Sequence, residues 1–126
     1  MAMTDDRNLI VAGGSSNLTY VYQRNSSSQY ELKGTLTEST DTINSIVMSP
    51  GIGNYLFTGG VDKKPRIYQA DSSKDAKYSI MPELLETSGV IVAMAYLEVS
   101  KRNTYLFVAF GNTVNTYVKN EASGQF

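Results

Sequence analysis

The residue types that carry most enzyme chemistry are missing or scattered in this chain. Its 126 residues contain neither histidine nor cysteine, which removes the commonest general base, the commonest metal ligand and the thiolate nucleophile. Asp71 and Asp75 flank a short serine-lysine loop and could offer carboxylate oxygens to Ca²⁺. Their spacing does not match a twelve-residue calcium loop with its glycine and closing glutamate. We therefore expect solvated loop charge here and no metal site.

Two further segments contain residue types used in catalysis or phosphate binding. Residues 13–17 read GGSSN, a composition found in phosphate-binding loops, but they lack the P-loop lysine and no helix is predicted to follow. Glu83 and Glu86 would share a face only if their segment were helical. We predict no catalytic residue and no cofactor, and we do not expect an enzyme.

Charge and hydropathy limit the partners further. The formal net charge is −1 and the isoelectric point is about 5.3, so there is no basic field to attract nucleic acid or an anionic membrane. The chain has no apolar run near the ~18 residues of a membrane span and no signal-peptide pattern at its start. A soluble, cytoplasmic location is therefore expected.

The pattern of apolar residues predicts ten short β-strands and no helix. Alternating or continuous apolar runs are separated by glycine, proline, asparagine and serine, as is typical of strands joined by turns. The predicted strands are 8–14, 18–23, 30–37, 43–49, 55–58, 66–69, 78–85, 90–97 and the two strands within 104–118. Residues 1–7 are predicted to be a disordered tail, and residues 121–126 a C-terminal tail.

These strands repeat along the chain. Shifting residues 8–23, NLIVAGGSSNLTYVYQ, by 46 positions places them on residues 54–69, NYLFTGGVDKKPRIYQ, without a gap. A third copy, TYLFVAFGNTVNTYV at 104–118, aligns with one deletion. A four-stranded repeat of about 46 to 50 residues has the size of a β-propeller blade.

Residues 43–71, INSIVMSPGIGNYLFTGGVDKKPRIYQAD, carry a resemblance to the WD-repeat family. INSIVMSP is similar to the family's inner strand with its Ser-Pro exit, YLFTGG to its second strand, and RIYQ to the end of its third strand. Asp62 stands where the family places a tight-turn aspartate. The resemblance implies antiparallel four-stranded propeller blades with strands A to D counted outward. It reads 8–37 as B-C-D, 43–85 as A-B-C-D and 90–118 as A-B-C, an all-β but incomplete propeller.

The chain lacks the Trp-Asp and Gly-His signatures of the family. Its network of Asp, His, Ser and Trp side chains is therefore not expected, and packing must hold the blades. We predict structural roles for glycines that end the second strands and for tyrosines that recur once per blade. These residues are Gly13, Gly14, Gly59, Gly60, Tyr22, Tyr68 and Tyr117.

The function implied by the resemblance is a protein–protein interaction scaffold. Binding is expected on the face where the D-to-A and B-to-C connections gather, because rigid strands there present loops. The predicted binding residues are Thr40, Asp41, Thr42, Asn44, Asp62, Lys63, Lys64, Ser88 and Gly89. Two and a half blades do not close a ring, so the chain is expected to be a fragment of a longer propeller or a subunit that other chains complete. The expected partners are other protein chains, which supply missing blades or a peptide, with a homo-oligomeric ring as another way to close the fold. The alternative function is a multivalent carbohydrate-binding propeller that stacks sugars on its recurring tyrosines.

Overall fold

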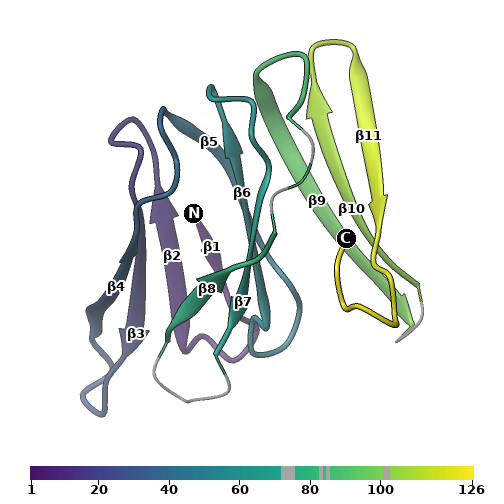
Figure 1. Ribbon diagram of the computed structural model, residues 1–126. Coiled ribbons are helices and arrows are strands. Elements are labelled where there is room, and N and C mark those ends of the chain that lie inside the picture. The colour runs from purple at the N-terminus through teal and green to yellow at the C-terminus, as the bar shows by residue number, and fades with distance from the viewer. Residues whose placement is uncertain (72–75, 83, 85, 101–102) are drawn as a thin grey trace.

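The protein is built from three antiparallel β-sheets that stand side by side (Figure 1). The computed structural model describes residues 1–71, 76–82, 84, 86–100 and 103–126. Sheet 1 contains β1 (Ala2–Met3), β2 (Leu9–Gly13), β3 (Thr19–Arg24) and β4 (Tyr30–Leu36). Sheet 2 contains β5 (Ile43–Met48), β6 (Tyr55–Gly60), β7 (Arg66–Ala70) and β8 (Tyr78–Ile80). Sheet 3 contains β9 (Ile91–Ser100), β10 (Asn103–Phe110) and β11 (Thr113–Val118).

The all-β prediction is confirmed. Each sheet is a meander in which neighbouring strands follow one another in the sequence, as in a blade of four strands. Within the described residues the fold contains no helix, and hence none long and apolar enough to cross a membrane. Sheet 3 has three strands, as the sequence predicts.

The sheets contact one another mainly through their first strands. The Asp5 amide, just after β1, donates to the carbonyl of Gly51 at 3.1 Å. The Met94 amide of β9 donates to the Ser45 hydroxyl of β5 at 2.9 Å. The Ile43 amide, at the start of β5, donates to the carbonyl of Gly14 at 3.0 Å, so β5 is joined to sheet 1 on one side and to sheet 3 on the other.

Two separate apolar cores lie between the sheets. The core between sheets 1 and 2 consists of Leu9, Val11, Val21, Leu56, Tyr68 and Ala76. The core between sheets 2 and 3 consists of Phe57, Ile67, Ile91, Met94, Leu106, Val108 and Phe110. Leu56 and Phe57 are adjacent in β6 and are both fully buried, because alternate side chains of a strand point to opposite faces. Sheet 2 is thus covered on both faces.

The cross-strand register shows that the sheets repeat residue by residue. We call the face of a sheet that points toward the sheet before it in the sequence its backward face, and the opposite face its forward face. In sheet 1, the forward face is the one that packs against sheet 2, and the backward face is the opposite one. The backward faces carry the aligned rows Met3–Ile10–Tyr22–Leu32, Met48–Leu56–Tyr68–Ile80 and Tyr96–Leu106–Tyr117. The forward faces carry Ala2–Val11–Val21, Val47–Phe57–Ile67 and Ala95–Phe107–Thr116.

The N-terminal residues correct a sequence prediction. Residues 1–7 are not a disordered tail, because β1 pairs with β2 and supplies the first strand of sheet 1. Thr4 is buried, and its hydroxyl accepts the Leu9 amide at 3.0 Å, as the Ser49 hydroxyl accepts the Tyr55 amide at 2.9 Å in sheet 2. Sheet 1 therefore has four strands where the sequence predicted three.

The ends of two other predicted segments also differ. The C-terminal residues fold back, so that the ring of Phe126 packs edge-on against Phe57 with a centroid distance of 5.4 Å. The predicted outer strand 78–85 is observed as β8, which ends at Ile80. Residues 83 and 85 of that prediction lie outside the described residues.

A left-handed turn before β2 gives a stability prediction. Arg7 has φ of 56°, and Gly53 holds φ of 70° at the same place before β6. This conformation is strained for a residue with a Cβ, so Arg7→Gly should raise the free energy of unfolding by about 0.5–1 kcal/mol. Urea denaturation measures the change, and Thr35→Gly, in the exposed part of β4, should lower stability instead. A loss of stability in Arg7→Gly would contradict the strain argument.

Candidate functional site

The predicted binding residues surround a buried ion pair where the β4–β5 loop meets the β6–β7 turn. The Asp62 Oδ2 atom lies 2.8 Å from the Arg66 Nη1 atom, and the two side chains are only 4% and 3% exposed. The same oxygen accepts the Ser39 hydroxyl at 3.1 Å and the Thr40 amide at 3.0 Å. One carboxylate therefore ties the entry of β5 to the turn between β6 and β7.

This network corrects the expectation that packing alone would hold the sheets. The sequence has no Trp-Asp or Gly-His pair, yet Asp62 makes a network through Ser39 and Arg66 instead. The turn itself is fixed because the Lys64 amide donates to the Asp62 Oδ1 atom at 3.3 Å. Asp62 thus has a structural role, and its side chain is not available to a ligand.

The carboxyl group of Asp62 has a lowered pKa. Burial would raise it, but hydrogen bonds from the Thr40 and Lys64 amides and the Arg66 guanidinium outweigh this effect and hold the pKa below its ordinary value of 3.8. The folded state therefore favours the ionised form. The resulting stabilisation is present above pH 3.8 and is lost as the pH falls through the lower pKa of the folded state.

The lowered pKa of Asp62 predicts how the stability of an Asp62→Asn variant depends on pH. The variant loses the charged interaction, so it should be less stable than the wild type at neutral pH. The difference in free energy of unfolding should shrink as the pH falls below 3.8, because the wild-type carboxylate becomes protonated. Urea denaturation of both proteins across this pH range measures the difference. The contributions of the other acidic groups are the same in both proteins and cancel in it. A difference that stayed constant with pH would contradict the assignment.

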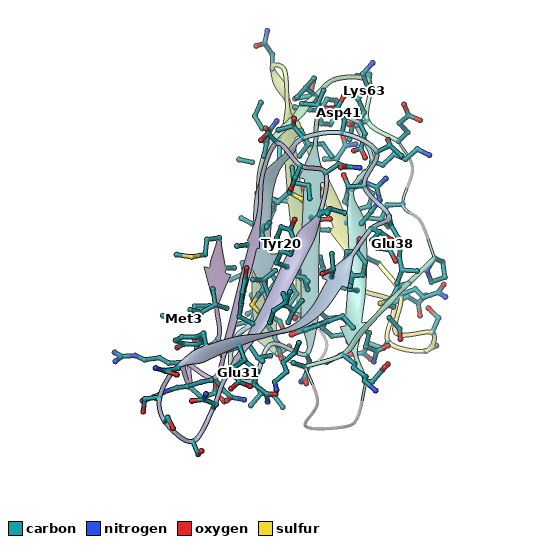
Figure 2. The ribbon with its side chains drawn as sticks, turned by 90° about the vertical axis from the view of Figure 1, so that its left-hand side faces the viewer. Met3, Tyr20, Glu31, Glu38, Asp41 and Lys63 are labelled. Atoms are coloured by element: carbon teal, nitrogen blue, oxygen red, sulfur yellow. The ribbon has the colours of Figure 1, made fainter. Side chains whose placement is uncertain are left out.

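The remaining predicted residues divide into those that are used internally and those that are exposed. The Asn44 Nδ2 atom donates to the carbonyl of Ile91 at 2.9 Å, and the Thr42 amide donates to the Asp41 carboxylate at 2.6 Å. The Lys63 carbonyl accepts the buried Thr87 hydroxyl at 3.0 Å. Asp41 and Lys63 lie at the same end of the molecule (Figure 2). Asp41, Thr40, Asn44 and Ser88 are exposed, whereas Thr42, Lys63, Lys64 and Gly89 are half-buried.

Sequence reasoning missed the two residues that brace these loops. Ser39 and Thr87 are both buried, and each stands four positions before the first residue of an inner strand, Ile43 or Ile91. Both follow a glutamate, so the repeated pairs Glu38-Ser39 and Glu86-Thr87 were a signal in the sequence. Both pairs lie in polar segments between predicted strands, and for this reason the repetition was not singled out.

The predicted structural glycines of sheet 2 lie so close to neighbouring atoms that a side chain would not fit, whereas those of sheet 1 are less crowded. A Cβ at Gly60 would collide with the carbonyl oxygen of Thr42, and a Cβ at Gly59 would lie 2.8 Å from the Met94 sulfur. A Cβ at Gly13 would lie 3.0 Å from Ile46, whereas Gly14 has open space around it. The glycine pair of sheet 2 is therefore required by packing.

The predicted structural tyrosines occupy one register position but three environments. Tyr68 is 1% exposed, and its hydroxyl donates to the Glu38 carboxylate at 3.2 Å. Burial is the main reason that the pKa of Tyr68 is strongly raised. Tyr117 packs against the core between sheets 2 and 3, and Tyr22 lies half-buried on the backward face of sheet 1.

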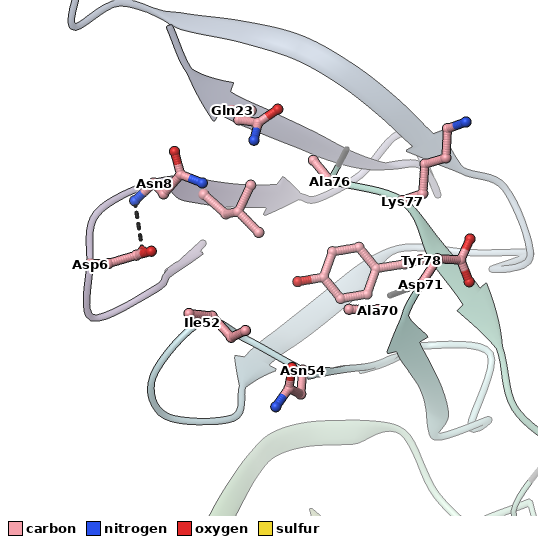
Figure 3. Close-up of a pocket in the computed structure, with 11 residues that line it drawn as sticks. Asp6, Asn8, Gln23, Ile52, Asn54, Ala70, Asp71, Ala76, Lys77 and Tyr78 are labelled. Carbon is pink, nitrogen blue, oxygen red and sulfur yellow. Dashed lines mark hydrogen bonds between the residues drawn. The ribbon is translucent and has the colours of Figure 1, made fainter. Parts of the chain in front are cut away.

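Two pockets lie between the sheets, away from the Asp62 network. The first, of about 500 Å³, lies between sheets 1 and 2 (Figure 3). Asn8, Gln23 and Asn54 line it together with the ring of Tyr78, whose hydroxyl donates to the Gly53 carbonyl at 2.7 Å. Burial raises the pKa of Tyr78 to about 12, so the hydroxyl is a neutral donor.

The second pocket, of about 420 Å³, lies between sheets 2 and 3 and is more polar. Tyr55 and Gln69 line it, and they hold the register positions that Leu9 and Gln23 hold in the first pocket. Lys119 lies over the Tyr55 ring, with its Nζ atom 4.5 Å from the centroid. None of the three tyrosines predicted to stack sugars is among the residues lining either pocket.

Metal binding finds no support among the described residues, where no three acidic side chains gather as ligands would. Asp75, one of the two candidate calcium ligands, lies outside the described residues.

No protein-family model matches the chain, and no curated protein matches it either. The structure itself shows an all-β protein with three antiparallel, blade-like sheets.

Proposed function

We propose that this chain is a protein–protein interaction unit of a WD-repeat-like propeller, in which other protein chains supply the missing blades. The observation that carries the proposal is a comparison of Phe57 with Phe107. The two residues hold the same place in the forward rows of sheets 2 and 3. Phe57 is fully buried by sheet 3, whereas no sheet within the described residues lies in front of Phe107, which stays partly exposed.

The whole forward face of sheet 3 shares this character. Its side chains are apolar or uncharged, and several large ones are exposed, with Leu97 at 47% and Val114 at 60%. The residues of this face are Ala93, Ala95, Leu97, Tyr105, Phe107, Ala109, Val114, Thr116 and Val118. Contiguous exposed apolar surface of this kind marks a site of protein association.

The backward face of sheet 1 is open in the same way. Its row repeats the one that sheet 2 buries, but here Leu32 is 52% and Met3 is 50% exposed. Figure 2 looks at the molecule from the side of sheet 1, where Met3 and Tyr20 are labelled. The chain therefore has one uncovered face at each end of its row of sheets, and both favour a protein partner.

The loops around the Asp62 network are the second surface of the proposal. Their backbone is held by the buried ion pair, so Asp41, Lys63, Lys64 and Ser88 are carried on a rigid base. Rigidly positioned loops suit recognition of a partner. For any partner identified, alanine at Asp41 and Lys63 should weaken binding, and unchanged affinity in both variants would remove these loops from the proposal.

Photo-cross-linking in the cells that make the protein tests the open face. A photoreactive phenylalanine analogue replaces Phe107, and a matched control carries it at Ser26, in the exposed β3–β4 turn. We expect a light-dependent adduct with a protein chain from position 107 only, which Leu97→Lys should abolish. The absence of any adduct from position 107 would overturn the proposed function.

The two pockets favour carbohydrate binding as a second candidate. Amide side chains recur at equivalent positions in both, with Tyr78 lining one pocket and Tyr55 and Tyr96 the other. Amides and aromatic rings suit hydroxyl-rich ligands, and a site at each sheet junction would bind multivalently. Asn54 lines both pockets, so Asn54→Ala should abolish binding on a glycan array, whereas Asn112→Ala in the β10–β11 turn should not. No binding by the wild type would exclude this candidate.

A further inference from the structure

We propose that the partner is a second copy of this chain, bound head to tail. The forward face of sheet 3 in one copy packs against the backward face of sheet 1 in the other. This inference rests on the proposed function, and it names both the partner and the two surfaces that meet. It follows from the contacts that the chain already makes between its own sheets.

The chain uses one kind of sheet contact twice. Between sheets 1 and 2, Val11 and Val21 of a forward row pack in one core with Leu56 and Tyr68 of a backward row. Between sheets 2 and 3, Phe57 and Ile67 of a forward row share a core with Leu106, and the backward-row Tyr96 and Tyr117 pack against that core. Each contact joins a forward face to the backward face of the next sheet.

In the part of the chain that the structure describes, one face of each kind is left without a partner sheet. The forward row Ala95–Phe107–Thr116 of sheet 3 and the backward row Met3–Ile10–Tyr22–Leu32 of sheet 1 are uncovered. They are the two halves of the contact that the chain makes internally. A dimer through two forward faces would instead need a contact that occurs nowhere between the described sheets.

The rows that would meet on association carry no charge, and Arg24, which lies on the backward face of sheet 1 at the end of β3, donates to the Ser28 hydroxyl at 2.8 Å. The residues of the forward face of sheet 3 and of the backward row of sheet 1 are all uncharged. Removing a charge from water without a partner costs several kcal/mol, so an uncharged face is a condition for this kind of packing. The exposed pair Lys33 and Glu31, in which Lys33 flanks Leu32, lies 3.1 Å apart and is already paired within the chain.

The number of sheets sets the number of copies. Propellers contain about 4–8 blades, and with three sheets in each chain only two copies give a total within that range. A head-to-tail contact that closes leaves no open face, whereas one that does not close continues into filaments. The proposal is therefore a closed ring of two chains and six sheets, with the same contact at both junctions.

Light scattering of the purified chain tests the assembly. We expect a mass twice the 13.8 kDa of one chain at high protein concentration and dissociation on dilution. Phe107→Lys and Tyr22→Glu each place a charge at both junctions and should each give monomers. Far-UV circular dichroism shows whether the variants are folded, and Leu97→Lys, at a residue already 47% exposed, is a milder variant on the same face.

Mixing the two variants gives the decisive readout. A mixed dimer has one junction with two unchanged faces and one in which the introduced lysine meets the introduced glutamate, so association should return on mixing. A dimer built from two forward faces would instead survive Tyr22→Glu, and that result would overturn the proposal. So would a wild type that stays monomeric at every concentration.

The two proposals can fail separately. If the wild type is monomeric but cross-linking from position 107 captures a different protein, the second copy is excluded and the proposed function stands. If the chain neither self-associates nor gives an adduct from position 107, both proposals fail. If the adduct contains only this chain, peptide mapping should find sheet 1 residues joined to position 107.

Discussion

Replacing Arg66 with leucine should lower the free energy of unfolding by about 3–5 kcal/mol. The substitution leaves the Asp62 carboxylate buried without its cation, and an uncompensated buried charge has a cost of that size. The Ser39 and Thr40 hydroxyls and two backbone amides would remain to bind it. Urea denaturation of wild type and variant measures the difference, provided that the free energy of unfolding falls with urea concentration at the same slope in both.

The exposed ion pair in sheet 1 provides the control. Lys33 and Glu31 also lie 3.1 Å apart, but their side chains are 40% and 51% exposed. Lys33→Leu should therefore change stability by less than about 1 kcal/mol. Adding Asp62→Leu to Arg66→Leu should recover part of the loss, because the stranded charge is gone. A loss below about 1 kcal/mol for Arg66→Leu would mean that water reaches Asp62.

Phe57→Ala should cost about 3–5 kcal/mol, the range for removing a large buried ring. Phe57 lies in the core between sheets 2 and 3. Its ring packs against those of Tyr96 and Phe126, with centroid distances of 5.1 and 5.4 Å. Little of the surrounding sheet can collapse into the space, because Gly59 already lies close to Met94 on this side.

Phe107→Ala is the matched control, since the residue type and the register position are the same. Below the concentration at which copies associate, it should cost about 1 kcal/mol or less, because the ring is partly exposed. At higher concentration the wild type should gain stability that Phe107→Ala lacks. Equal losses in Phe57→Ala and Phe107→Ala at low concentration would contradict the difference in burial.

The sequence predicted the repeated strands well because their signal is periodic. The alignment of residues 8–23 with residues 54–69 holds without a gap, and the observed strands of sheets 1 and 2 keep the same register. The first strand escaped prediction because it has two residues, and because its loop to β2 is one residue shorter than the corresponding loop of sheet 2. A short strand gains its stability from a neighbour, which the local sequence does not reveal.

The candidate site was less predictable. Asp62 was placed correctly in a tight turn, but its partners depend on how the loop around Ser39 folds over that turn. Arg66 was not among the predicted site residues, because nothing local distinguishes a buried arginine from an exposed one. Asn44 was predicted as a binding residue, although its side-chain amide donates to Ile91 of the neighbouring sheet.

The separation of the two cores has a consequence for the motions of the protein. Sheet 2 belongs to both cores, whereas sheets 1 and 3 each belong to one and do not share it. Either outer sheet can therefore open while the opposite core stays packed, as in a linear array of repeats. Amide protons of β6 should exchange with solvent only on global unfolding, and those of β3 and β10 by smaller, independent openings. The molecule would then come apart one sheet at a time, from its ends toward β6.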